Sequence, residues 1–268
     1  MSVQAPPLGD LQQQILDSLR REGIATADVR ELFGEELWAE ARADVTPFVA
    51  EQTETRASLA DKPENKDEFI VRRYMRQKPR VPFTLASPWL RIGSSETMLG
   101  IVNAYRGLQT RLFYLDNWFT PPYAAADERI ASQRWHRDPE EEHVVKVFLY
   151  LSDVTEDAGP FEYVRGSAPG GRYGHLWPWG EGKAKPTDEE MASAVSAEDV
   201  VTMTCSAGTM VFCDTSGFHR GGFAKSKPRV LAIWSYVSPS AEKTGHRFEV
   251  DLEGREAELS PDARFALA

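Results

Sequence analysis

Cysteine is scarce in this sequence, and the scarcity bears on both redox chemistry and metal binding. Only Cys205 and Cys213 occur in 268 residues, on either side of a turn at 206–208. If that turn joins antiparallel strands, the two cysteines lie about four rungs apart, roughly 13 Å at ~3.3 Å per residue. Because a disulfide needs Cα atoms within ~7 Å, we expect two buried free thiols, which suit a reducing cytoplasm. The low count also argues against a cysteine-rich structural zinc site.

Long apolar runs and positive charge are scarce as well. No stretch approaches the ~20 apolar residues of a membrane span, and the N-terminus, MSVQAPPLGDLQQQ, lacks the basic head and apolar run of a signal peptide. Lys and Arg number 31 against 41 Asp and Glu, a formal net charge of -10. Such a balance argues against nucleic acid or an anionic membrane as a general partner. No sequence pattern specifies an oligomeric state.

Apolar residues are plentiful enough for a large core. The chain is 41% hydrophobic with seven tryptophans, and its length fits one domain spanning residues 1–268. Residues 8–51 have helical periodicity, with a first run that ends at Gly23 and a second that stops near Pro47. Residues 53–68 are polar and predict a connecting loop or a flap.

Short β runs replace the helical pattern from Phe69 onward. We expect strands at 69–71, 112–115, 144–151, 200–204, 209–213 and 230–237, and a helix at 99–105. The runs 200–204 and 209–213 predict a hairpin. Many short strands between Gly and Pro turns indicate a mainly β (α+β) fold, an antiparallel barrel or jelly roll over about 69–240 with an α-helical flank.

A long insertion interrupts the β region at 168–198. It contains Trp177, Trp179 and a Thr187–Glu190 capping box that predicts a short helix. Loops of this length inside a compact domain are usually functional. We therefore expect a lid that is mobile without ligand, with Trp177 or Trp179 in contact with a small organic substrate. A plain surface loop is the alternative, and it explains two tryptophans poorly.

The most informative pattern is a His-x-Asp pair, His136 and Asp138, followed far downstream by His219. Residues two apart on a strand share a face, so the pair can turn toward one ion while His219 comes from another strand. Two imidazoles and one carboxylate are the ligand set of a non-haem Fe(II) centre that keeps positions open for a co-substrate and oxygen.

Arg229 stands ten residues after His219. We expect the turn at 224–228 to fold the strand carrying His219 back onto the strand that begins at Arg229, within perhaps 10 Å of the metal ligand. A guanidinium pairs bidentately with a carboxylate. It would therefore suit the far carboxylate of a keto acid whose near end chelates the metal, such as 2-oxoglutarate.

A structural interpretation of these residues is the alternative, since a His-x-Asp pair or a histidine in a glycine-rich turn also occurs by chance. The three elements in this order favour a metal site. The other histidines fit it less well: we expect His143, His175 and His246 to be exposed, with substrate contact a second option for His175.

The chain resembles the phytanoyl-CoA dioxygenase family of Fe(II)/2-oxoglutarate oxygenases. The resemblance rests on the segment WHRD at 135–138, on DAGPFEYVRGS at 157–167, and on His219 with Arg229. It implies a double-stranded β-helix core with His136, Asp138 and His219 on iron and Arg229 on 2-oxoglutarate. Two positions, Arg165 and Ala168, depart from the family loop, where Pro and His are usual, and neither is a ligand.

The resemblance also implies the reaction. The metal ligand Asp138 favours oxygenation over halogenation, because related halogenases have Gly or Ala there. We expect O2 and 2-oxoglutarate to be consumed, succinate and CO2 to be released, and a C–H bond of a small molecule, a secondary metabolite, to be oxidised, with hydroxylation favoured. Gln133, Tyr114 and Trp135 are further candidates for lining the cofactor pocket.

Three further alternatives stay open at this point. Lys146 is a candidate for the same pocket, although strand alternation would equally let it face solvent. The basic residues between Arg72 and Arg80 could hold an acidic group of the substrate or simply protect an edge strand. The same barrel and ligands could also serve a cupin-like binding protein or a non-redox metal enzyme, and a non-catalytic interaction domain would not need the three ligands.

Overall fold

Two antiparallel sheets face each other in the computed structural model, which describes residues 7–56, 69–75, 79–123, 128–178, 185–241 and 247–268. The larger sheet has the strand order β1-β7-β4-β9-β3-β2, and the smaller has the order β6-β5-β8. The strands are β1 Ile24–Asp28, β2 Val71–Arg72, β3 Arg111–Thr120, β4 Val145–Tyr150, β5 Phe161–Val164, β6 Val200–Thr202, β7 Thr209–Asp214, β8 His219–Gly221 and β9 Arg229–Val237.

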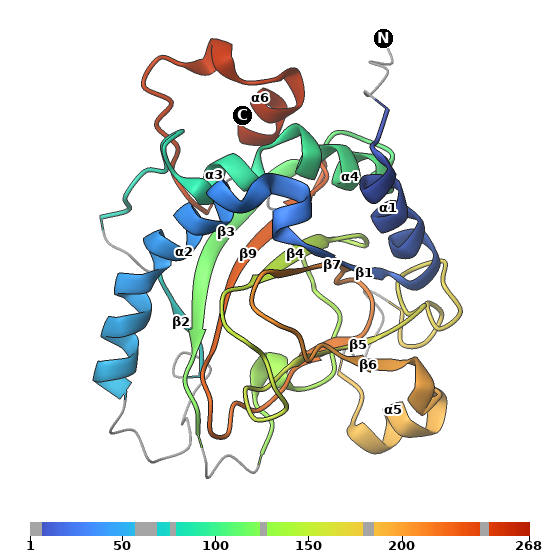
Figure 1. Cartoon of the computed structure of the whole chain (residues 1–268). Coiled ribbons are helices and arrows are strands. Elements are labelled where there is room, and N and C mark those ends of the chain that lie inside the picture. Colours follow the sequence, from blue (N-terminus) through green and yellow to red (C-terminus); the bar gives the residue numbers. More distant parts are fainter. Residues whose placement is uncertain (1–6, 57–68, 76–78, 124–127, 179–184, 242–246) are drawn as a thin grey trace.

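The N-terminal helices pack on the outer face of the larger sheet, while α5 lies beside the smaller one (Figure 1). This arrangement confirms the predicted fold class, a mainly β jelly roll of the double-stranded β-helix type with a helical flank. The helices are α1 Asp10–Glu22, α2 Val29–Arg56, α3 Pro88–Gly93, α4 Glu96–Arg106, α5 Asp188–Ala194 and α6 Pro261–Leu267, with 3-10 turns η1 Ala131–Gln133, η2 Ala197–Asp199 and η3 Glu256–Glu258.

Strand β4 shows how the larger sheet separates the core from the barrel interior. Val145, Val147 and Leu149 pack in the cluster beneath the helices. Phe148 and Tyr150 alternate with them and join the cluster between the two sheets. Because successive strand residues point to opposite faces, an uninterrupted apolar run is what a strand covered on both faces requires.

Three expectations about the elements are wrong. The run 200–204 does not pair with 209–213: β6 pairs with β5 in the smaller sheet, whereas β7 pairs with β1 and β4 in the larger one. The turn between β6 and β7 therefore connects the smaller sheet to the larger one. The predicted helical flank is interrupted by β1, which is too short for its alternation to be read. Helix α2 also continues through Pro47, because buried Val45 and Phe48 hold both sides of the proline on the sheet.

Several local predictions are confirmed. Gly23 ends α1 in the left-handed conformation, and Thr187 caps α5 by accepting a hydrogen bond from the backbone N–H of Glu190. Both cysteines are free, as predicted, but only Cys213 is buried; the expected burial of Cys205 is wrong, since it is partly exposed. Of the predicted loop at 53–68, residues 53–56 belong to α2 and the remainder lies outside the described residues. No helix in the described part of the chain is long and apolar enough to span a bilayer.

Gly23 offers a test of how tightly the N-terminal helix is fixed to the barrel. Its φ is 77°, and a Cβ there would lie 2.3 Å from the Tyr163 hydroxyl oxygen. Gly107 ends α4 with a φ of 67°, yet a Cβ there meets no described atom within 4 Å. Both substitutions by Ala carry the left-handed cost of about 1 kcal/mol, and Gly23→Ala adds an overpacking cost of roughly 1–3 kcal/mol.

We therefore expect Gly23→Ala to lower the free energy of unfolding, measured by urea denaturation, by clearly more than Gly107→Ala does. Equal losses in the two variants would contradict the tight contact between the end of α1 and Tyr163.

Candidate metal centre and its cavity

Backbone pairing between two distant segments brings the three predicted ligands together. His136 and His219 form an antiparallel bridge, with hydrogen bonds of 3.1 and 3.0 Å in the two directions between their amide and carbonyl groups. The amide of Asp138 donates to the carbonyl oxygen of Thr215 at 2.9 Å. One ligand atom from each of the three side chains lies within 4.8 Å of the others. The expected cluster of two imidazoles and one carboxylate is present.

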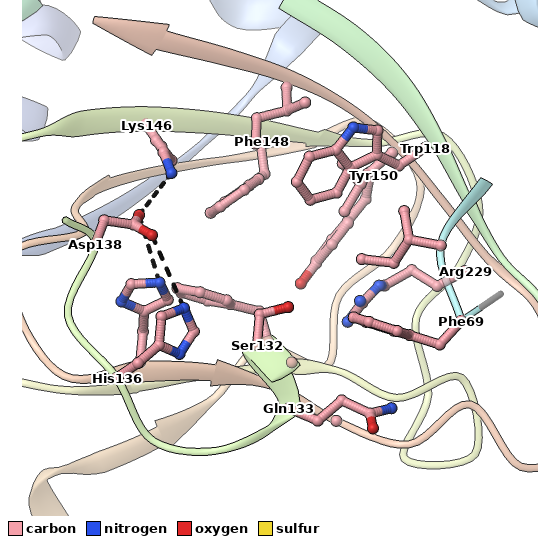
Figure 2. A pocket seen from close by; sticks show the side chains of 17 residues that line it. Phe69, Trp118, Ser132, Gln133, His136, Asp138, Lys146, Phe148, Tyr150 and Arg229 are labelled. Carbon is pink, nitrogen blue, oxygen red and sulfur yellow. Dashed lines mark hydrogen bonds and ion pairs between the residues drawn. The ribbon is translucent and has the colours of Figure 1, made fainter. Parts of the chain in front are cut away.

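Both imidazoles have the same orientation toward the cluster. The Nδ1 atom of His136 lies 2.8 Å from the carbonyl oxygen of Arg134, and Nδ1 of His219 lies 2.9 Å from that of Gly217. A carbonyl can only accept, so Nδ1 is the protonated nitrogen in each ring and Nε2 holds a lone pair. The Nε2 atoms lie 3.8 and 3.6 Å from the two Asp138 carboxylate oxygens (Figure 2).

Burial and neighbouring charge keep these groups in the protonation states that a metal needs. Burial lowers the pKa of His219 to about 3, and it also lowers the pKa of His136. Burial acts to raise the pKa of Asp138, but the Lys146 ammonium together with the His219 and His136 imidazoles outweighs it, and the carboxyl pKa lies below its usual value. Two neutral imidazoles and one carboxylate are therefore available at neutral pH.

A cavity, partly open to solvent, opens directly from the cluster. Its wall is formed by Phe69, Ile70, Trp118, Ser132, Gln133, His136, Asp138, Lys146, Phe148, Tyr150, Phe161, His219, Gly221, Gly222, Arg229, Leu231 and Ile233. Aromatic and aliphatic side chains make up about half of this wall, and the charged ones are few (Figure 2).

Arg229 lies at the end of the cavity away from the cluster, with Phe148 and Tyr150 between them (Figure 2). It is buried and donates from Nη1 to the carbonyl oxygen of Gly159, while its Nε finds no hydrogen-bond partner among the described residues. Burial lowers the pKa of the guanidinium. A buried cation in a cavity wall with an unused N–H is suited to an anionic ligand.

The expected hairpin between the His219 and Arg229 strands is wrong. β8 belongs to the smaller sheet and β9 to the larger one, so the two residues face each other across the barrel. The chain segment 222–228 passes from one sheet to the other. Arg229 nonetheless lines the same cavity as the three candidate ligands.

Of the further residues predicted to line the cofactor pocket, two lie in the cavity wall and two do not. Gln133 lines the cavity, with its side-chain oxygen held by the amide of Ile130 at 3.1 Å, and Lys146 lines it too. Tyr114 is buried behind Lys146, whose Nζ lies 5.6 Å from the centre of its ring, and Tyr114 is not part of the wall. Trp135 faces the opposite side of the smaller sheet, beneath the guanidinium of Arg220.

Sequence reasoning missed other parts of the wall. Phe148 and Tyr150 follow Lys146 at every second position, so alternation within 144–151 could have identified all three as one face. Trp118 and Ser132 gave no comparable sequence pattern. They reach the cavity only through the register of β3 and the turn η1.

Arg137, between two of the ligands, was missed as well. Its side chain turns away from the cavity and donates to the backbone carbonyl oxygens of Ser167, Ser216, Tyr173, Gly174 and Leu176, and its guanidinium lies 3.9 Å from the centre of the Phe218 ring. This single buried cation therefore ties the start of the insertion to the segment that precedes His219.

The insertion is placed differently from the expectation. Trp177 packs edge-on against Phe218, and none of the described residues of 168–198 lines the cavity. Trp179 lies outside the described residues. The predicted contact of Trp177 with a substrate in this cavity is therefore not seen. His175 is exposed, His143 is paired with Asp214 at 3.0 Å, and His246 lies outside the described residues.

The basic cluster between Arg72 and Arg80 is divided. Arg73 pairs with Asp44 of α2 at 2.5 Å, whereas Arg72 stacks on Trp118, with its guanidinium 5.2 Å from the ring centre. Arg80 is exposed, and Arg76 and Lys78 lie outside the described residues. Neither Arg72 nor Arg73 belongs to the cavity wall.

The family model for phytanoyl-CoA dioxygenase matches residues 25–229. The chain belongs to the phytanoyl-CoA dioxygenase family. The matched range contains all three candidate metal ligands and ends at Arg229, and it confirms the resemblance inferred from the sequence. A search of curated protein sequences found no match.

Solved structures of similar fold include several enzymes. The epimerase SnoN, in complex with Fe3+, alpha ketoglutarate and nogalamycin RO, has a TM-score of 0.57 at 18% identity over 91% of each chain. The carbocyclase SnoK has 0.55 at 16% identity, covering 96% of this chain and 95% of its own. EctD from S. alaskensis, with 2-oxoglutarate and 5-hydroxyectoine, has 0.55 at 14% identity, covering 93% and 83%. At these identities the likeness concerns the fold.

Because the pKa values of His136 and His219 are lowered in the folded protein, we expect the free energy of unfolding of the metal-free protein to depend on pH. The pKa of histidine is 6.5 in the unfolded chain, and the pKa of His219 in the folded chain is about 3. The unfolded chain therefore binds more protons than the folded chain between these values. The stability linked to His219 is present above pH 6.5 and is lost as the pH falls toward 3.

We expect His219→Gln to show a smaller loss of unfolding free energy between pH 6.5 and about 4 than the parent protein, measured by denaturation in the presence of a chelator. Taking the difference between the two proteins removes the contribution of His143, whose raised pKa acts in the opposite direction. Parallel pH profiles would contradict a neutral, buried His219.

Proposed function

We propose that this protein is a non-haem Fe(II)- and 2-oxoglutarate-dependent dioxygenase that hydroxylates a C–H bond of a small organic molecule, releasing succinate and CO2. One observation supports this most strongly: a single cavity has the two-histidine, one-carboxylate cluster at one end and the buried Arg229 guanidinium at the other. A dicarboxylic keto acid has matching ends, one to chelate a metal and one to pair with arginine.

His136, Asp138 and His219 would hold the iron, and the fit rests on their donor atoms. Both Nε2 lone pairs and the carboxylate oxygens converge, while each Nδ1–H is engaged by a backbone carbonyl that prevents ring rotation. Such outer hydrogen bonds orient metal-binding histidines. Bound iron would supply coordination sites for the keto acid and O2 and the redox capacity for C–H oxidation.

The cavity wall has two tasks in this proposal. Arg229 binds the distal carboxylate, and the Tyr150 hydroxyl points into the space between Arg229 and the cluster (Figure 2). Phe148, Phe161 and Ile233 exclude water from the space between the metal end and the arginine end. A dry cavity strengthens the pairing of opposite charges within it.

A small, mostly apolar molecule is the substrate class that we propose. The wall also offers Phe69, Ile70 and Trp118, with Ser132 and Gln133 as uncharged polar groups. Structures of this fold include SnoN and SnoK from nogalamycin biosynthesis, which supports a secondary metabolite. Since those proteins are an epimerase and a carbocyclase, the assay should record the product mass and not only succinate.

The alternative is a cupin-like metal-binding protein or a non-redox metal enzyme on the same barrel. Neither explains a buried guanidinium at the far end of the metal cavity, because burying an unpaired cation is unfavourable unless a ligand uses it. The free thiols Cys205 and Cys213 support a reducing cytoplasm as the location within this proposal.

We expect the protein to bind about one Fe(II) per chain. Replacing His136, Asp138 or His219 with Ala should abolish metal binding and 2-oxoglutarate-dependent succinate formation, because each supplies one of three ligands. His175→Ala, at an exposed histidine outside the cavity, is the control. Metal analysis after desalting is the measurement, and undiminished iron in all three ligand variants would sink the assignment.

Arg229→Gln should weaken 2-oxoglutarate binding to the metal-loaded protein by about 30- to 1000-fold, because a charge-assisted bidentate contact contributes about 2–4 kcal/mol. Metal affinity should change little, since Arg229 does not contact the ligands. Arg134→Gln, an exposed arginine close in sequence to His136, should leave the calorimetric titration unchanged. A normal titration for Arg229→Gln would remove it from the co-substrate site.

A further inference from the structure

Lys146 lies at the metal end of the cavity, and its role is not covered by the ligand set or by Arg229. Its Nζ is 2.6 Å from one Asp138 oxygen and 3.4 Å from a Glu140 oxygen, and it lies against the Tyr114 ring. The side chain is 8% exposed, so it does not reach bulk solvent. It also belongs to the cavity wall.

This position distinguishes Lys146 from a lysine in an ordinary surface ion pair. The inner face of β4 presents Lys146, Phe148 and Tyr150 to the cavity, and the sheet pairs Lys146 with Ser235 of β9. Its only described anionic neighbours within hydrogen-bond reach are the candidate ligand Asp138 and, less closely, Glu140. An ammonium therefore sits beside the one charged ligand of the candidate metal centre.

We propose that Lys146 is an electrostatic positioning residue: by neutralising the Asp138 carboxylate, it leaves the bound metal with enough net positive charge to hold a dianionic co-substrate. This inference rests on the proposed function. The single carboxylate of a two-histidine, one-carboxylate set reduces the net charge of an Fe(II) site from +2 to +1. The adjacent ammonium brings the net charge of the site back to +2. In a cavity of low polarity, a unit charge acts strongly on an anion bound nearby.

The charges of Lys146 and Glu140 should have opposite effects on binding of the dianionic co-substrate. Removing the lysine charge should weaken binding of the dianion. Removing the Glu140 charge should strengthen it, because Glu140 opposes the lysine from 3.4 Å. A lysine that merely held Asp138 in place would give a different result, since its loss would weaken metal binding first.

Lys146→Gln separates the two roles, because a glutamine amide can still donate to Asp138 while lacking the charge. Lys146→Arg keeps the charge, and Glu140→Gln reverses the direction. Metal dissociation constants are measured with Mn(II) by electron paramagnetic resonance. Calorimetric titration of 2-oxoglutarate into the Mn(II)-saturated proteins gives the anion affinity without turnover.

For Lys146→Gln we expect metal binding no weaker than in the parent protein and 2-oxoglutarate binding about tenfold weaker. Lys146→Arg should retain 2-oxoglutarate binding, and Glu140→Gln should tighten it. Unchanged 2-oxoglutarate binding in Lys146→Gln, with or without a loss of metal affinity, would overturn the inference, as would weaker binding in Glu140→Gln. If the parent protein bound neither metal nor 2-oxoglutarate, the proposed function itself would fail instead.

Discussion

The alternation of side chains along the strands of the larger sheet is the constraint on which both the helix-covered core and the barrel interior depend. On β9, Val230, Ala232 and Trp234 point to the helices, whereas Leu231 and Ile233 point into the barrel. A shift of one residue in the pairing would exchange these two sets. The register with β3 and β4 is therefore fixed by apolar burial on both sides, and Arg229 and Lys146 are brought to the cavity by the same register.

That register explains how ionisable groups are kept inside an apolar barrel. Burying a charge is costly unless a partner compensates it. Asp138 and Lys146 compensate each other at 2.6 Å, and Arg137 is compensated by backbone carbonyl oxygens and an aromatic face. Arg229 differs. Among the described residues its side chain makes one hydrogen bond, to the carbonyl oxygen of Gly159, and its Nε has no partner. Arg229 lines the cavity, so under the proposed function an anionic ligand there would complete its compensation.

Some of this arrangement could be read from the sequence, and the rest could not, for physical reasons. The His136, Asp138 and His219 cluster was predictable because a ligand set is a combination of residue types in order. The long apolar run of β4 and the glycine end of α1 were predictable from local patterns. Sheet membership was not, because β6 and β7 are each consistent with a hairpin, and only long-range packing decides that they separate. The roles of Lys146 and Tyr150 likewise depend on which face of β4 turns inward.

The insertion shows why composition alone misled about the cavity. Trp177 and Tyr173 are aromatic residues in a long loop, which is a pattern typical of a lid. In the structure they complete a third apolar cluster behind the smaller sheet, with Phe218, Val164 and Met191. Arg137 ties the start of this loop to the segment that carries the candidate ligands His136 and Asp138. The described part of the insertion therefore supports the candidate metal centre from behind, whereas Phe69, Ile70 and the turn η1 contribute to the cavity wall. Variation in substrate preference should then follow those residues, since they line the cavity without being candidate ligands.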